Sequence, residues 1–429
     1  MNSPFTLGES QALDIARACV ASKLSSPHLP HDDVDLVGTG ALDSMGWVDT
    51  LIGIESAASI RNFGNPWPDD RPKSIRALAD MIREAQKPSP DKSAGAGTRQ
   101  QADGERDIAV GGWGYAIGSL AVDADQIERT LALPLHKIRD GAGIQSVRLA
   151  AEGEDELAFG QRASDVALEM TEIPVEQIDF LVATSATFLG FPSLAASLHS
   201  RLLLRETCAA LDVGGACAGL IYSLAVAKSL LHTKPEGVAL VVAAEVHSRR
   251  LSAPHVPGEF LGLFGDGACA FILTNASNAP QKDRLRLREF VWGCSGTFAS
   301  SLGVKVAANA ELEVQFKGEQ LARAAVTELD RIIGALENLS AKPRGGVDYF
   351  ALHQPNPRVV EILAEKAKIP LERIPLLSKT CGNLGSVTCG ASLCQALTSL
   401  RTSGDPSRTP LIFMAAVAPG LLRGGAFLD

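Results

Sequence analysis

The 429-residue sequence predicts an α/β protein that carries a small helical bundle at its N-terminal end. From Asp107 onward, apolar strand-like runs alternate with helical patterns and are joined by glycine turns, which is typical of an α/β fold. Three helical stripes come before this region, and a stretch without large apolar side chains separates the two parts. We therefore expect a helical bundle at residues 1–87, a flexible linker at 88–105 and an α/β domain at 106–429.

Composition excludes several classes of protein. The chain is 46% hydrophobic and 21% charged, as in a well-packed globular protein. Its net charge of −9, without a block of basic residues, argues against nucleic acid and anionic membranes as partners. The eight cysteines lack the paired spacing of zinc sites, so we expect no metal. With no signal-peptide pattern and no run long enough to span a membrane, we expect a cytoplasmic protein with reduced thiols.

The helices of the bundle are expected over residues 8–24, from Ser44 onward and over 74–86. Ser44 is placed to cap the middle helix, whose apolar face holds Met45, Val48, Leu51 and Ile52. Three short helices and one long polar loop predict a small bundle.

The sequence Leu42-Asp43-Ser44-Met45 stands at the start of that middle helix. With this motif, the first 87 residues resemble an acyl carrier protein. The resemblance implies that Ser44 carries 4′-phosphopantetheine as a covalent ester, and the linker would let such an arm swing at high local concentration. The alternative is that Ser44 only caps the helix, because Asp-Ser pairs are common.

The run from Leu211 to Leu224 predicts the end of a strand, a glycine turn and a helix of small and apolar residues. Cys217 falls where that helix begins. The positive end of the helix dipole and nearby N–H groups favour a thiolate there, which is the nucleophilic form. The alternative is a buried structural cysteine, since free cysteines are among the most buried residues.

A weak internal repeat divides the α/β domain into halves at about 106–280 and 281–429. The glycine-rich turn and helix around Cys217 are echoed by those at residues 381–393. Two similar halves could direct two helix N-termini into one shared pocket.

Two polar residues stand at turns that fit this arrangement. His353 directly follows an apolar strand, and Asn383 lies in a glycine turn. Together with Cys217 they provide what thioester chemistry needs. The thiolate takes an acyl group, and the histidine and asparagine donate hydrogen bonds to a second thioester carbonyl as it becomes an enolate.

On these motifs, in this order, residues 107–429 resemble a β-ketoacyl-acyl carrier protein synthase III of the thiolase superfamily. The resemblance implies a thiolase-like fold of two stacked αβαβα halves, and a homodimer. It assigns catalysis to Cys217, His353 and Asn383, and the oxyanion hole to the amides of Cys217 and Gly420.

The same resemblance assigns two outer residues. Phe191, in Phe191-Pro192-Ser193, would reach across the dimer interface into the acyl pocket, and Arg358 would dock acyl carrier protein. Residues 135–144 lack the tryptophan and arginine that stack the adenine of coenzyme A in such enzymes, which favours a carrier-borne acyl thioester. Pro419 replaces a glycine of the oxyanion loop and removes one N–H donor.

The expected function is decarboxylative Claisen condensation with a malonyl-type thioester through an acyl-Cys217 intermediate, with Ser44 carrying the phosphopantetheine arm. The fused carrier indicates a polyketide, specialised lipid or other secondary-metabolite pathway. One alternative is a non-decarboxylating acyltransferase of the same fold that passes the acyl group to an alcohol, amine or thiol. Another is a non-catalytic partner that binds carriers.

Overall fold

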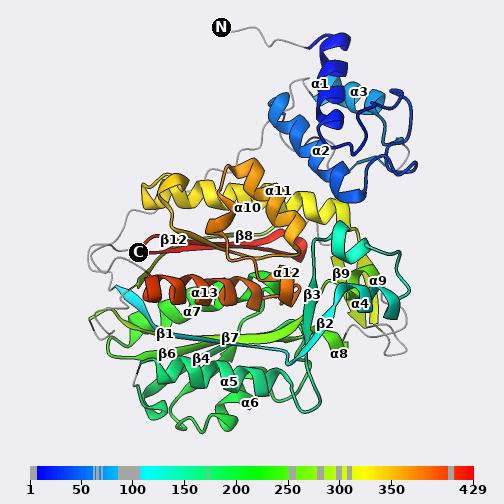
Figure 1. Ribbon diagram of the computed structural model, residues 1–429. Helices are drawn as coiled ribbons and strands as arrows, with labels where there is room; N and C mark the ends of the chain where they lie inside the picture. Colours follow the sequence, from blue (N-terminus) through cyan, green and yellow to red (C-terminus); the bar gives the residue numbers. More distant parts are fainter. Residues whose placement is uncertain are drawn as a thin grey trace. The chain divides into compact units, whose positions relative to one another are not determined.

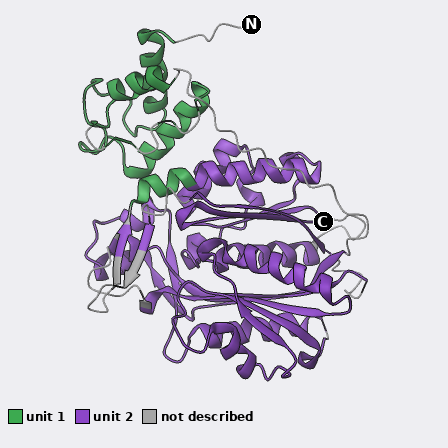
Figure 2. Cartoon of the chain, turned by 180° about the vertical axis from the view of Figure 1, so that it is seen from behind, with its two compact units in different colours: residues 1–102, 317–324 green, residues 103–316, 325–429 purple. Residues whose placement is uncertain are grey.

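The computed structural model describes residues 7–60, 63, 67–68, 71–85, 107–171, 173–250, 258–277, 285–295, 302–306, 312–403 and 410–429 (Figure 1). The predicted linker at 88–105 lies outside the described residues. The chain divides into two compact units, Met1–Ala102 with Lys317–Ala324, and Asp103–Phe316 with Ala325–Asp429 (Figure 2). Each unit is described by itself.

Unit 1 contains the helices α1 (Glu9–Ala21), α2 (Ser44–Ala57) and α3 (Ile75–Ala85). Their apolar stripes meet in one core, in which Trp47 packs edge-on against Trp67 with 4.9 Å between the ring centroids. The carboxyl group of Asp43 accepts a hydrogen bond from the N–H of Gly46 at 2.6 Å and caps α2. The cap is therefore Asp43 rather than Ser44, and Ser44 is the first residue of the helix.

Unit 2 holds the elements of the α/β domain. The first half contains β1 (Ile108–Ile117), β2 (Leu120–Asp123), α4 (Ala124–Thr130), β3 (Ser146–Leu149), α5 (Glu156–Glu169), β4 (Ile178–Thr184), α6 (Leu194–Arg201), β5 (Ala209–Asp212), α7 (Gly219–Thr233), β6 (Val238–Val246), α8 (His247–Arg250), α9 (Gly258–Leu261) and β7 (Asp266–Asn275). The second half contains β8 (Leu285–Gly293), β9 (Leu302–Val306), β10 (Leu312–Phe316), β11 (Tyr349–Leu352), α11 (Pro357–Ala367), α12 (Ser378–Cys381), α13 (Val387–Ser403), β12 (Ile412–Ala418) and β13 (Leu422–Leu428). The helix α10 (Gly318–Ser340) begins in unit 1 and continues in unit 2 from Ala325.

Nine strands are hydrogen-bonded in the order β11-β12-β13-β8-β1-β7-β6-β4-β5. In Figure 1 they form two layers, with α5 and α6 outside one, α11 outside the other, and α7 and α13 between them. The fold is thus a five-layer αβαβα arrangement. Strands β6 and β12 are buried on both faces, which explains why their sequences are continuous apolar runs.

The middle layer brings the beginnings of α7 and α13 together in one hydrophobic core. A Cβ on Gly390 of α13 would lie 2.6 Å from Leu220 of α7 and 2.3 Å from the sulfur of Cys269. Only glycine permits this close approach of the two helices. The two glycine-rich turns of the sequence therefore lead into the same layer.

Among the described residues, one stretch is long and apolar enough to cross a membrane by composition, Ala216–Thr233. It is the core helix α7 with its preceding turn, and half of it is buried within the protein. A helix that is apolar all round is expected in the middle of a layered fold.

Candidate active site

Cys217 lies in a single 3₁₀ turn, Ala216–Ala218, directly before α7. Ala216 adopts a left-handed backbone conformation with φ of 45°, which turns the chain sharply from β5 into the helix. A Cβ on Gly219 would lie 2.3 Å from the hydroxyl of Thr184, so glycine lets the helix start against β4. The prediction that Cys217 stands at the beginning of a helix agrees with this geometry.

The thiol of Cys217 differs from the expectation of a stabilised thiolate. Burial raises its pKa to about 12, and the nearby Glu245 carboxylate acts in the same direction. The effect of burial on the thiol pKa is therefore larger than the opposite effect of the helix N-terminus. Cys217 is therefore a protonated thiol at neutral pH, and it must lose its proton when it attacks a substrate.

His353 follows β11, and its N–H donates to the carbonyl of Ala415 at 2.8 Å. Only 3% of the residue is exposed. Burial, with a smaller contribution from His247, lowers the pKa of His353 to about 4, although a hydrogen bond with the backbone of Gly385 acts in the opposite direction. His353 is thus neutral at pH 7, and its buried Nδ1 has no hydrogen-bond partner among the described residues. A buried polar atom without a hydrogen-bond partner lowers the stability of the fold unless a bound ligand supplies that partner.

Asn383 is fixed by its own backbone. Its N–H donates to the carbonyl of Leu263 at 2.8 Å, and its carbonyl accepts from the N–H of Gly265 at 3.0 Å. A Cβ on Gly265 would lie 2.0 Å from the carbonyl oxygen of Cys381, so this bridge requires glycine. The side-chain Oδ1 accepts from the N–H of Gly385 at 2.9 Å, which leaves the Nδ2 amide as a donor for another group.

Gly385 is the point at which the separate parts of the site meet. Its φ is +61°, and a Cβ there would lie 2.6 Å from the ring of His247 and 3.2 Å from the side chain of Glu245. The same residue contacts Asn383 and His353 through hydrogen bonds. His353 and Asn383 therefore meet at this turn, and Cys217 is linked to it through Glu245, whose carboxylate also raises the pKa of the Cys217 thiol.

Glu245 and His247 are the residues of this site that the sequence does not single out. Glu245 is the penultimate residue of the buried strand β6 and is itself fully buried. His247 follows the strand, stacks on Phe264 with 4.5 Å between ring centroids, and lies 3.2 Å from the carbonyl of Gly265 through Nδ1. A charged residue at the end of an otherwise apolar strand is the one signal that could have found them.

The other predicted site residues lie apart from these contacts. Phe191 is fully exposed, and Arg358, the second residue of α11, forms an ion pair with Glu361 at 3.2 Å. Gly420 follows β12 with φ of +75°, a left-handed conformation that suits glycine. Among the described residues, no hydrogen bond or ion pair joins Phe191, Arg358 or Gly420 to the Gly385 turn.

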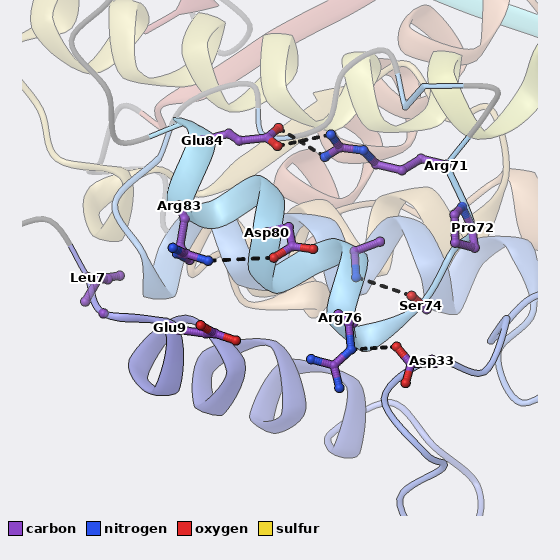
Figure 3. A pocket seen from close by; sticks show the side chains of 12 residues that line it. Leu7, Glu9, Asp33, Arg71, Pro72, Ser74, Arg76, Asp80, Arg83 and Glu84 are labelled. Atoms are coloured by element: carbon purple, nitrogen blue, oxygen red, sulfur yellow. Dashed lines mark hydrogen bonds and ion pairs between the residues drawn. The ribbon is translucent and has the colours of Figure 1, made fainter.

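A separate hollow of about 640 Å³ lies in unit 1 (Figure 3). Three arginines line it, and each is paired with a carboxylate: Arg71 with Glu84 at 3.0 Å, Arg76 with Asp33 at 2.6 Å, and Arg83 with Asp80 at 3.9 Å. Because these guanidinium groups are already matched by negative charge, we assign no anionic ligand to the hollow. Within the described part of the chain, no group of three His, Cys, Asp or Glu side chains gathers as a metal site requires.

The depressed pKa of His353 predicts a loss of stability in acid. Between its ordinary pKa of 6.5 and about 4, the unfolded chain binds a proton at this residue and the folded chain does not. The wild-type protein should therefore lose about 2–3 kcal/mol more unfolding free energy between pH 7 and pH 4.5 than His353→Gln loses. Denaturant unfolding at both pH values measures this difference, and identical pH dependence of the two proteins would contradict it.

The α/β domain matches known families over most of its length. Residues 135–330 match the FAE1/type III polyketide synthase-like family model, and residues 341–429 match the C-terminal domain of 3-oxoacyl-[acyl-carrier-protein] synthase III. A β-ketoacyl-[acyl-carrier-protein] synthase III of Serratia proteamaculans is 30% identical over 291 residues, which cover 67% of this chain and 88% of that protein. The chain belongs to the β-ketoacyl-acyl carrier protein synthase III family. It is an acyltransferase-class condensing enzyme, as predicted.

Another synthase III relative agrees with this assignment, and solved structures share the fold. The synthase III of Ruegeria pomeroyi is 29% identical over 324 residues, covering 74% of this chain and 98% of that protein. The structure of the Aquifex aeolicus synthase III has a TM-score of 0.66 at 23% identity, covering 75% of this chain and 99% of that one. OleA of Xanthomonas campestris has a TM-score of 0.66 at 18% identity, covering 76% and 98%. The predicted thiolase-like fold is confirmed, whereas neither family model reaches the residues before 135, so the carrier resemblance stays a prediction.

Proposed function

We propose that this synthase III family member performs decarboxylative Claisen condensation through an acyl-Cys217 intermediate. The observation that carries the proposal is the convergence of His353, Asn383 and the surroundings of Cys217 on the Gly385 turn. A neutral histidine and an amide nitrogen without a partner among the described residues can both donate hydrogen bonds to one developing oxyanion.

The reaction has two stages. In the first, the sulfur of Cys217 attacks the carbonyl carbon of an acyl thioester, and the donor thiol leaves with the proton that Cys217 gives up. In the second, a malonyl-type thioester loses CO₂, and the electron pair of the broken C–C bond forms an enolate. His353 and Asn383 stabilise the enolate oxygen, and the enolate carbon attacks the carbonyl carbon of acyl-Cys217. The C–S bond breaks, and Cys217 leaves as a thiolate that takes up a proton from water.

The tetrahedral intermediates need an oxyanion hole, for which we propose the amides of Cys217 and Gly420. The left-handed conformation of Gly420 suits a tight turn at the end of β12. Pro419 has no N–H to donate, so this loop offers the amide of Gly420 at that point.

We propose that Ser44 carries 4′-phosphopantetheine. Asp43 caps α2, and the half-buried Ser44 makes no hydrogen bond with the described residues, so its hydroxyl is available for esterification. When bound, the group would supply the terminal thiol that holds an acyl thioester. We expect the acyl donor to be carrier-bound rather than coenzyme A, with Arg358 docking the carrier.

We also propose a homodimer built on the free edge of the sheet at β5. Its residues are largely exposed, and the nearby loops expose the large apolar side chains of Leu189, Phe191 and Leu203. An unpaired edge beside exposed apolar groups favours pairing with a second copy. Sedimentation should give twice the chain mass of 45.1 kDa, and Leu203→Glu should shift the protein toward monomer; a monomeric wild type would contradict this proposal.

The setting we propose is cytoplasmic, in polyketide, specialised lipid or other secondary-metabolite synthesis, with no nucleic acid or membrane as partner. The alternative activity is acyl transfer without decarboxylation from Cys217 to an alcohol, amine or thiol. The two are separated by the fate of malonyl thioester, because condensation must release CO₂.

Mass spectrometry tests the whole scheme. The protein is first pantetheinylated with a phosphopantetheinyl transferase and coenzyme A, and peptides around Ser44 and Cys217 are then followed after addition of an acyl donor. The acyl group should appear on both sites, and malonyl thioester should then yield CO₂ and a ketoacyl product. Acyl-Cys217 without CO₂ release would favour the non-decarboxylating acyltransferase. An unmodified Cys217 would contradict both enzymatic activities and favour a non-catalytic role in binding carriers.

A further inference from the structure

The carboxyl group of Glu245 makes four hydrogen bonds although it is fully buried. Its Oε2 accepts from the N–H groups of Ala186 at 2.9 Å and Thr187 at 3.1 Å and from the hydroxyl of Ser185 at 3.3 Å, and the hydroxyl of Ser386 donates to Oε1 at 2.6 Å. No arginine or lysine of the described residues forms an ion pair with it. A buried carboxyl group in this setting is retained only because so many donors satisfy it.

These hydrogen bonds join two loops that are far apart in the sequence. Ser386 lies three residues after Asn383, and residues 185–187 begin the loop that leads to Phe191. Thr187 extends the network, because its hydroxyl donates to Glu156 at 2.9 Å and accepts from the N–H of Val246 at 2.8 Å. The end of β6 thus holds both loops in a fixed relation.

We propose that Glu245 is a positioning residue of the condensing site, whose carboxyl group ties the Asn383 loop to the loop leading to Phe191. This role rests on the proposed function, because it assigns Glu245 to the Cys217 site. After burial, the charge of Glu245 also raises the pKa of Cys217, which supports its place in that site.

The charges around Glu245 are few. Glu245 raises the pKa of Cys217 after burial, and it is the smallest of the causes that raise the pKa of Cys269 on β7, behind burial, Cys394 and Cys389. The other titratable side chains near it are His247 and His353 across Gly385, and Glu156 beyond Thr187. Replacement by glutamine removes the charge and keeps an acceptor for the two N–H groups, whereas replacement by alanine removes both.

The first test needs no substrate. Alkylation of Cys217 by iodoacetamide is followed from pH 7 to pH 10.5 by peptide mass spectrometry, which separates Cys217 from the exposed Cys294. Glu245→Gln should alkylate faster than wild type at pH 8.5, because removing the nearby negative charge favours the thiolate. Glu156→Gln is the matched control, a buried glutamate on the same network, and should leave the profile unchanged. A wild-type profile in Glu245→Gln would overturn the assignment of Glu245 to the Cys217 site.

The second test measures whether the hydrogen bonds of Glu245 hold residues 185–187 in place. Hydrogen exchange at Ala186 and Thr187 should be about 10-fold or more faster in Glu245→Ala than in Glu245→Gln, which keeps the acceptor oxygen. Ser386→Ala, which deletes a single hydroxyl, should lower the kcat of condensation about 3- to 10-fold with little change in KM. This variant tests the same role if Glu245→Ala does not fold. Unchanged exchange in Glu245→Ala, or unchanged kcat in Ser386→Ala, would overturn the positioning role. If wild type itself does not condense, the proposed function fails, while alkylation and exchange still decide the role of Glu245.

Discussion

Cys217→Ala should lower the condensation rate at least about 1,000-fold, because the acyl group then has no covalent site in the enzyme. The half-buried Cys217 stands in the turn directly before α7, where the proposed mechanism places the acyl group. Product formation from an acyl thioester and malonyl thioester, measured by mass spectrometry, gives the ratio of the rates.

Two control variants make this result specific. Cys19→Ala removes a half-buried thiol in unit 1 and should leave condensation within about 2-fold of wild type. Ser44→Ala should abolish loading of the protein's own arm, yet it should still condense acyl groups supplied on a separate carrier. Condensation at an undiminished rate by Cys217→Ala would rule out the acyl-enzyme, and undiminished self-loading by Ser44→Ala would rule out the arm.

The main features of the fold could be predicted because each depends on local sequence. Continuous apolar runs such as Val238–Val246 indicate strands buried on both faces, and glycine turns before small-residue helices indicate α7 and α13. The motifs around Cys217, His353 and Asn383 could also be found, because each combines a chemically active side chain with a turn at the end of an apolar strand.

The thiol's protonation state could not be predicted from sequence. The pKa of Cys217 depends on how much solvent the surrounding layers exclude and on the charge of Glu245, which lies 28 residues further along the chain. Helix polarity, the local effect, pointed toward a thiolate, and the non-local effects outweigh it. Glu245 and His247 were missed for the same reason, since only the packing of Gly385 against β6 brings them to the site.

Separate replacement of His353 and Asn383 by alanine should split the two stages of the reaction. Each change should lower the decarboxylation of malonyl thioester by about 100- to 1,000-fold, equivalent to about 2.7–4 kcal/mol, because one donor to the enolate oxygen is lost. Acylation of Cys217 should stay within about 10-fold of wild type, since that step uses the thiol and the proposed oxyanion amides. Release of CO₂ and the mass of the acylated Cys217 peptide measure the two stages independently.

Separate effects on acylation and decarboxylation would distinguish the proposed condensation from acyl transfer without decarboxylation. His199→Asn, which alters a histidine on α6 that bonds the carbonyl of Arg205, should change neither stage and controls for the loss of an imidazole. If His353→Ala slowed acylation and decarboxylation equally, His353 would serve the attack of the thiol rather than the enolate. If neither replacement affected decarboxylation, the Gly385 turn would not be the enolate site. The neutral state of His353 explains why we expect the first outcome: with a pKa of about 4 it is a weak base for the thiol but a competent donor to an enolate oxygen.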